Sequence, residues 1–170
     1  MKYRLIPIVA VFFAAAMVVA DPLADFKKWY MKGLPVMVKA MEGKNIGFFE
    51  KASTKDFTYT EASGKKSDKK TAIAGLKQMF DSSEKVKLVP KVGAIQNSRA
   101  GITVDLTNRF EMITKPGPDK KTHKMVMVQK NRELWVNVDG KWLLKNIADV
   151  GPAKSTMDGK PMPAGAMGGG

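Results

Sequence analysis

The chain has 170 residues, of which 29 are Lys or Arg and 16 are Asp or Glu, with no cysteine and one histidine. This composition excludes disulfide scaffolds, thiol catalysis and thiolate metal sites, and one histidine is too few for a zinc enzyme, so we expect neither a metal nor a cofactor. The lysines are spread along the chain without an arginine-rich block, which disfavours nucleic acid as a partner and predicts a solvated basic surface.

The N-terminus has the pattern of a cleaved export signal. Positive charge in the first four residues precedes an apolar run over residues 5–19, which Ala20 closes. The run is shorter than the about 20 apolar residues that a membrane-spanning helix needs, and Val18 and Ala20 suit signal peptidase. We expect residues 1–20 to be a signal peptide and the protein to be secreted or periplasmic, without a stable membrane span after cleavage. The alternative is an uncleaved membrane anchor.

The segment after the expected cleavage site has the pattern of amphipathic helices. Gly33 and Pro35 are expected to bend the first helix or split it in two, because proline interrupts helical hydrogen bonding. A second short helix is expected over residues 45–52, a strand over residues 57–61, and a third helix capped at residue 67 or 68. The apolar residues of the first helix recur at three- and four-residue steps: Leu23, Phe26, Tyr30, Leu34, Met37, Val38 and Met41.

The second half of the chain changes from a helical to an alternating pattern, which predicts strands. Residues 86–94 form the first of these strands, and residues 102–112 form the clearest, with one apolar and one polar face. Another strand is expected over residues 123–136, and Asp139-Gly140 is a two-residue hairpin signal before the last strand. Residues 151–170 are rich in Gly, Pro and Met without periodicity, so we expect a disordered tail there.

Helices followed by a strand, a helix and a long antiparallel meander give an α+β order and exclude a doubly wound parallel sheet. Several segments resemble the SnoaL-like, ketosteroid-isomerase-like branch of the nuclear transport factor 2-like superfamily, which includes secreted domains: Phe48-Phe49 and residues 56–64, 71–76 and 139–142. The resemblance implies a cone-shaped fold of about three N-terminal helices packed on a curved, mainly antiparallel sheet with a conical cavity. We therefore place one domain at residues 21–150.

The same resemblance implies a role for Glu61. In enzymatic relatives such as ketosteroid isomerase, a carboxylate at this position abstracts a proton, and partial burial would raise its pKa and improve it as a base. Met37 falls near the helical position where the isomerases carry a tyrosine, and its thioether cannot donate a hydrogen bond, so the chain departs from the isomerase pattern there. The alternative is that Glu61 is an ordinary solvated residue at a strand end.

Three further polar residues are candidate ligand-binding groups. Asn108 falls on the apolar face of its strand, between Leu106 and Phe110, where a buried amide needs hydrogen-bond partners or a ligand. Tyr59 and Gln129 also place polar groups near the expected cavity. The alternative is that these side chains have structural partners only.

Three classes of function follow from the sequence. The first is an exported, non-catalytic module that binds a small apolar or amphipathic ligand or self-associates, for example as a homodimer. The second is an isomerase, cyclase or hydrolase-type enzyme with Glu61 as the general base. The third is a protein that interacts with the cell envelope through its basic surface, which strong salt dependence of binding to an anionic polymer would mark.

We predict that the mature chain begins at Asp21, because a charged start, an apolar run and a small residue at position 20 occur in the required order. The measurement is the intact mass of protein extracted from the envelope or the medium of an expressing cell. A mass that still includes residues 1–20 would refute the prediction.

Overall fold

The computed structural model describes residues 21–163, so the expected signal peptide and residues 164–170 lie outside the described residues. The helices are α1 (Pro22–Glu42), α2 (Ile46–Ala52) and α3 (Lys69–Ser82). The strands of this part of the chain are β1 (Ser53–Thr60), β2 (Lys66–Asp68), β3 (Ser83–Ser98), β4 (Gly101–Thr114), β5 (Lys124–Val138), β6 (Lys141–Asp149), β7 (Lys154–Met157) and β8 (Lys160–Pro161). None of the helices within residues 21–163 combines the length and apolarity needed to cross a membrane.

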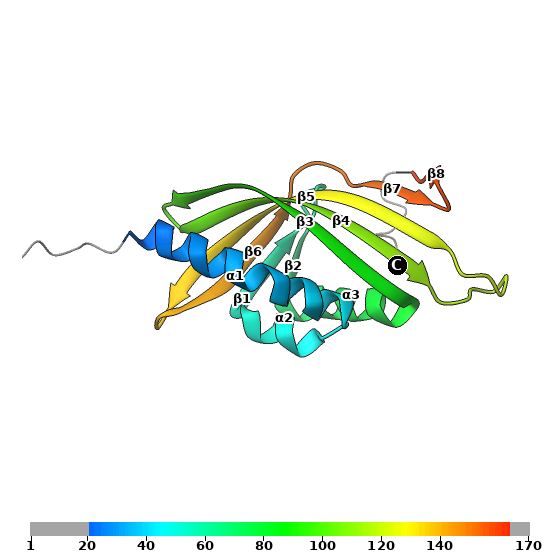
Figure 1. Cartoon of the computed structure of the whole chain (residues 1–170), viewed down its shortest axis with the longest axis horizontal. Coiled ribbons are helices and arrows are strands. Elements are labelled where there is room, and N and C mark those ends of the chain that lie inside the picture. Colours follow the sequence, from blue (N-terminus) through cyan, green and yellow to red (C-terminus); the bar gives the residue numbers. More distant parts are fainter. Residues whose placement is uncertain (1–20, 164–170) are drawn as a thin grey trace, which may run out of the picture.

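The strands form one mixed sheet in the order β2-β1-β6-β5-β4-β3, and the helices lie on one side of it (Figure 1). The pair β1–β6 is parallel, and the other pairs are antiparallel. Since β4 occupies one edge of β5, the other edge is shared: residues 131–138 pair with β6, and residues 125–128 pair with β7. The expected α+β class, with three helices packed on a mainly antiparallel sheet, is confirmed.

Helix α1 begins where its sequence provides a cap. The Asp21 side chain accepts a hydrogen bond from Leu23 N at 3.0 Å, and Pro22 takes the first helical position, where its missing N–H costs nothing. Contrary to one of the two expected outcomes, the helix is not split at Gly33 and Pro35. Pro35 lies on the exposed side, while residues before and after it pack on the same sheet and keep both halves in line.

Two apolar clusters join the helices to the covered face of the sheet. In the first, the fully buried Phe26 ring lies 4.8 Å from the Trp142 ring, 5.6 Å from the Tyr30 ring and 6.2 Å from the Trp135 ring, measured between centroids. Such aromatic contacts add stability to the burial of apolar area. The second cluster contains five methionines beside Phe80, Val86 and Leu88: Met37, Met41, Met79, Met112 and Met125.

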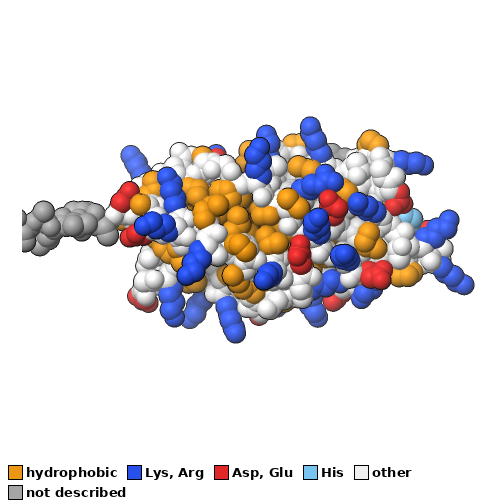
Figure 2. Space-filling view, viewed as in Figure 1, with side chains coloured by type: hydrophobic (Ala, Val, Ile, Leu, Met, Phe, Trp, Pro, Cys, Tyr) orange, Lys and Arg blue, Asp and Glu red, His pale blue; other side chains and the backbone are white. Residues whose placement is uncertain are grey.

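Some apolar side chains of α1 remain exposed, although the Trp29 ring also lies beside the sheet, 5.3 Å from the Trp135 ring. Trp29 is 41% exposed and Val36 is 55% exposed, and Figure 2 shows an apolar area beside α1 with basic side chains around it. The lysines of this face point outward, as the sequence predicts for a solvated basic surface.

The expectation of disorder from residue 151 onward is wrong for β7 and β8. Strand β7 pairs with β5 from Met125↔Met157 to Val128↔Lys154, and β8 pairs with β7. The β7–β8 turn is held by polar contacts that no apolar periodicity reveals. Asp158 Oδ2 lies 2.6 Å from His123 Nδ1, and Asp158 Oδ1 accepts from Lys124 N at 2.8 Å. Backbone pairing and these contacts order a segment that has no apolar face of its own.

We predict that deleting residues 153–170 lowers the free energy of unfolding by on the order of 2 kcal/mol, because several backbone hydrogen bonds worth about 0.5–1.5 kcal/mol each are lost. Urea denaturation followed by tryptophan fluorescence measures the change. Deletion of residues 164–170 is the matched control, since it removes no residue of β7 or β8. Equal midpoints for the two truncated chains would show that β7 adds nothing to stability.

Candidate functional site

Four polar side chains form a continuous chain of hydrogen bonds, the polar network, on the helix-covered face of the sheet. The Tyr59 hydroxyl donates to Asp149, at 2.9 Å from Oδ1 and 2.8 Å from Oδ2. Asn131 Nδ2 donates to Asp149 Oδ1 at 2.7 Å, and Asn108 Nδ2 donates to Asn131 Oδ1 at 3.1 Å. The network therefore crosses the four neighbouring strands β1, β6, β5 and β4.

The register of the sheet brings these four residues together. Asn131 is paired with Asp149 across β5 and β6, and with Leu106 across β5 and β4, two residues from Asn108. Tyr59 is paired with Ile147 across the parallel strands β1 and β6, two residues from Asp149. Because residues two apart share a face of a strand, all four side chains lie on the face that α1 covers.

The direction of the hydrogen bonds in the network is fixed at one end by Asp149. An ionised carboxylate only accepts hydrogen bonds, so Asn131 must turn its amide nitrogen toward Asp149 and its amide oxygen toward Asn108. Asn108 in turn must present its own nitrogen to Asn131. The Asn108 oxygen is therefore the free end of the network, and it is an acceptor.

That free end has no partner among the described residues. Asn108 Oδ1 is shielded from solvent and accepts no hydrogen bond there, one of two such buried side-chain atoms together with Thr54 Oγ1. A buried acceptor without a donor costs roughly 1–3 kcal/mol. Along β4, Asn108 lies between Leu106 of the first apolar cluster and Phe110, which packs against the second. An unpaired acceptor thus lies at the boundary between two apolar clusters.

A buried carboxylate, that of Glu133, lies on the same face as the half-buried Asp149. Glu133 is 4% exposed, and its Oε2 accepts from the Tyr30 hydroxyl at 3.0 Å and from Trp135 Nε1 at 2.8 Å. Burial raises the pKa of Glu133 to about 7, although these two hydrogen bonds act to lower it. Burial and the neighbouring Glu133 together raise the pKa of Tyr30. The Glu133 contacts tie α1 to the middle of β5.

Several solved structures have the same arrangement of helices and strands. One is a nuclear transport factor 2 (NTF2-like) superfamily protein from Salmonella enterica, 12% identical, with a TM-score of 0.60 over 77% of this chain and 94% of that one. Another is the hexachlorocyclohexane dehydrochlorinase LinA-type3 from Novosphingobium barchaimii, 9% identical, with a TM-score of 0.57 over 84% and 94%. A SnoaL-like protein from Shewanella denitrificans is 12% identical, with a TM-score of 0.53 over 74% and 89%.

The chain has the nuclear transport factor 2-like fold. Neither a protein-family model nor a curated protein matches the sequence. Identities this low show the fold alone, and one fold supports many unrelated functions. The chemistry of this domain therefore has to be inferred from its own residues.

Within this nuclear transport factor 2-like fold, Asp149 is already surrounded by donors. Burial raises the pKa of Asp149, while hydrogen bonds from Tyr59, the backbone N–H of Ala62 and Asn131 act to lower it, and the nearby charge of Glu61 adds to the increase. Burial and the contact with Asp149 also raise the pKa of Tyr59. The carboxylate of Asp149 is thus a hydrogen-bonded anchor that accepts from three donors.

The three predicted ligand-binding residues separate into two groups. Tyr59 and Asn108 belong to the same polar network, which the sequence did not show. Gln129 lies on the same face of β5 as Asn131 but makes other contacts: its Nε2 donates to Lys130 O at 2.8 Å and to Gly151 O at 3.0 Å. Gln129 therefore holds the connection between β6 and β7 and is not part of the network.

Glu61, predicted as a general base, lies just after the end of β1. Its Oε1 is 3.8 Å from Lys65 Nζ, its Oε2 accepts from the Ser63 hydroxyl at 3.4 Å, and its side chain is 39% exposed. The carboxylate thus has cationic and polar partners at the surface. Met37 packs against the second apolar cluster and contributes no polar group to the site.

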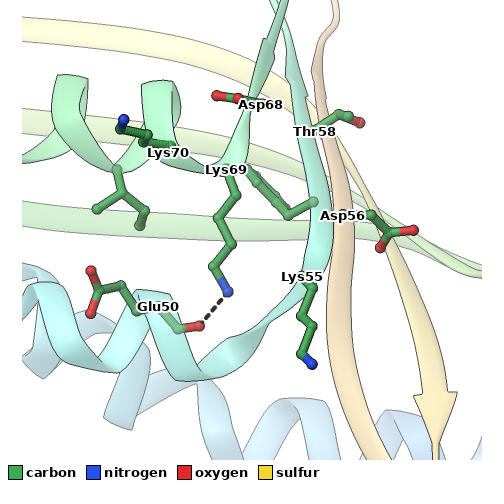
Figure 3. A pocket seen from close by; sticks show the side chains of 9 residues that line it. Glu50, Lys55, Asp56, Thr58, Asp68, Lys69 and Lys70 are labelled. Carbon is green, nitrogen blue, oxygen red and sulfur yellow. Dashed lines mark hydrogen bonds between the residues drawn. The ribbon is translucent and has the colours of Figure 1, made fainter.

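A pocket of about 700 Å³ lies elsewhere, between α2, β1 and the start of α3 (Figure 3). Three of its charged side chains already hold these elements together. Lys69 Nζ donates to the backbone oxygens of Glu50 at 2.6 Å and Ser53 at 3.0 Å, Asp68 caps α3 through Thr71 N at 2.8 Å, and Asp56 pairs with Lys145. These three side chains are engaged, whereas the charged groups of Glu50, Lys55 and Lys70, which also line the pocket, form no ion pair within residues 21–163.

Sequence reasoning missed Asp149, Asn131 and Glu133. A signal was present for two of them, because Asn131 and Glu133 are in phase with Trp135, a residue expected in the core. Polar residues at core positions of a strand need partners, as the polar residue Asn108 does on β4. No comparable signal exists for Asp149, since its partner Tyr59 is 90 residues away along the chain.

We predict that Glu133 makes the domain less stable as pH rises from about 4.5 to 7. The unfolded carboxyl loses its proton near 4.5 and the folded one near 7, so the folded state is favoured below this window and loses roughly 3 kcal/mol across it. Urea denaturation across this window should show a steep slope in the native chain and a shallower slope in Glu133→Gln. The pKa values of Asp149 and His123 are also raised, so both residues lower the free energy of unfolding as pH rises. They do so equally in the native chain and in Glu133→Gln. Identical slopes would exclude Glu133 as the cause.

Proposed function

We propose that this domain is an exported, non-catalytic module that binds a small amphipathic molecule on the helix-covered face of its sheet. The observation that carries the proposal is the polar network, whose direction is fixed by Asp149 and whose free end is the unpaired acceptor Asn108 Oδ1. A buried acceptor left without a donor favours a partner that supplies one.

The surroundings of Asn108 indicate the kind of ligand. A hydrogen-bond donor, such as a hydroxyl or an amide N–H, satisfies Oδ1, and an apolar body fits the clusters on either side. Because Oδ1 is shielded from solvent, the ligand has to displace neighbouring side chains to reach it. The second cluster suits such a displacement, since methionine side chains are flexible and adapt to differently shaped partners. The expected ligand therefore has one polar donor on a compact apolar frame.

The carboxylates count against catalysis as the main function. A general base needs a free lone pair within reach of the substrate, and the oxygens of Asp149 accept from Tyr59 and Asn131. Glu61 is paired with Lys65 at the surface. An isomerase, cyclase or hydrolase-type reaction with Glu61 as the base stays a hypothesis. Its test is a loss of about 10²- to 10⁴-fold in turnover by Glu61→Gln, on any substrate that the native chain converts.

Export is part of the proposal and rests on the sequence of residues 1–20. The start of α1 supports it, because Asp21, the expected first residue of the mature chain, is also the N-cap of the helix. Cleavage before Asp21 therefore leaves the capped helix intact.

We predict that the native chain binds 2-naphthol roughly tenfold more tightly than 2-methoxynaphthalene. The two probes share an apolar double ring, but only 2-naphthol can donate to Asn108 Oδ1, and pairing this acceptor is worth about 1–3 kcal/mol. Asn108→Leu should bind both probes equally. Equilibrium dialysis with absorbance detection measures all the dissociation constants.

Thr103→Val is the matched control, because Thr103 lies on the same strand but on the opposite face of the sheet. This variant should keep the native preference for 2-naphthol. Circular dichroism of each variant checks that the domain still folds. Equal binding of the two probes by the native chain, or an unchanged preference in Asn108→Leu, would overturn the proposed site.

A further inference from the structure

The face of the sheet that the helices leave uncovered is strongly basic. Outward-facing residues of β3, β4 and β5 alternate with the core residues of the same strands. Among them, seven basic side chains accompany only two acidic ones. The basic residues are Lys85, Lys87, Lys91, Arg109, Lys124, Lys130 and Arg132, and the acidic residues are Asp105 and Glu111.

Both acidic residues are already paired. Asp105 accepts two hydrogen bonds from Arg132, at 2.7 Å and 3.2 Å. Glu111 lies 3.0 Å from Arg109 Nε and 3.5 Å from Lys124 Nζ. Four outward lysines make no ion pair with any residue in the described range 21–163: Lys85, Lys87, Lys91 and Lys130. The uncovered face thus carries positive charge that the chain itself does not neutralise.

Two of these lysines border a groove of about 270 Å³. Lys91 is paired with Thr107, and Thr107 with Lys130, so the lysines are two strand spacings apart, about 10 Å. The Asp105–Arg132 pair and Gly93 also line the groove. An anionic group between Lys91 and Lys130 would be near their two ammonium groups and the hydroxyl of Thr107.

We propose that this uncovered face binds a linear polyanion, with one acidic group seated between Lys91 and Lys130 and its neighbours along the chain near the remaining lysines. Lysine acts as a compact point charge and attracts closely spaced anionic groups without demanding one geometry. Lys91 and Lys130 alternate with core residues of their strands and face away from the polar network, although Leu106 and Asn131 also line the groove. The proposal does not rest on the proposed small-molecule function.

Other partners fit this face less well. A second copy of the chain brings the same excess of positive charge, and like charges repel at an interface. Bases of single-stranded nucleic acid need aromatic side chains to stack on, and the aromatic residues of β4 and β5 face the core: Phe110 and Trp135. A linear polymer can lie in the groove, whereas a flat lipid surface cannot enter it and makes no additional contact there.

The test uses inorganic polyphosphate as the probe, with the mature chain and two double variants of equal charge. Lys91→Gln combined with Lys130→Gln should weaken binding about tenfold, since each exposed ionic contact contributes modestly. Lys27→Gln combined with Lys28→Gln removes two exposed lysines from α1 and should change the affinity less than about twofold. Binding should weaken as salt is added, because these charges are screened. Fluorescence anisotropy of labelled polyphosphate measures the affinities.

Several outcomes would overturn the proposal. Equal losses in the two double variants would mean that only net charge matters and that the groove is not a site. Tighter binding to phosphatidylglycerol vesicles than to polyphosphate would assign the face to a lipid surface instead. No binding of polyphosphate by the native chain at low salt would refute the proposal directly. Unchanged binding of 2-naphthol and an unchanged circular dichroism spectrum confirm that the groove variants are folded.

Discussion

The two-residue alternation along β4 and β5 is the constraint on which the rest of the molecule depends. On one face, Leu106 and Trp135 pack beneath α1, and the polar residues Asn108 and Asn131 occupy positions of the same phase. On the other face, the same strands direct lysines and arginines to solvent. A shift of either strand by one residue would exchange these faces, placing lysines against α1 and the apolar cluster in water.

The two faces differ in charge as well as in polarity. The covered face carries acidic groups and amides, with Glu133 and Asp149 held by donors from the chain, while unpaired cations are kept outside. Because these acidic groups and the cations lie on opposite faces, residues 21–163 contain no buried ion pair between them. The desolvation cost of a buried ion pair often exceeds its Coulomb attraction. Both carboxylates are stabilised instead by neutral donors, namely tyrosine, tryptophan and asparagine. The interior therefore offers acceptors, and the exterior offers cations.

Local patterns in the sequence predict the parts of the fold that depend on neighbours in the chain. Asp68 caps α3, and Asp139 and Gly140 both take positive φ values, 50° and 79°, as the hairpin signal requires. The parts that depend on distant pairing are not visible in the same way. The parallel contact of β1 with β6 brings Tyr59 to Asp149, and β7 is ordered by the free edge of β5. For this reason Tyr59 and Asn108 could be named as candidates, but Asp149, which connects Tyr59 to the rest of the network, could not.

The parallel pairing of β1 with β6 has a consequence for how the chain acquires its structure. Strand β1 begins at Ser53, and its parallel neighbour β6 begins only at Lys141, so a growing polypeptide cannot complete the sheet until nearly all of it has been made. Packing of helix α1 also depends on late residues, because Phe26 and Tyr30 both contact the Trp135 ring, more than 100 positions later in the chain. Contacts this distant in sequence slow folding and leave apolar segments uncovered meanwhile. A nascent chain with such contacts is expected to remain largely unfolded until its last strands have been synthesised. An unfolded chain is also the form of a polypeptide that can pass through a narrow channel.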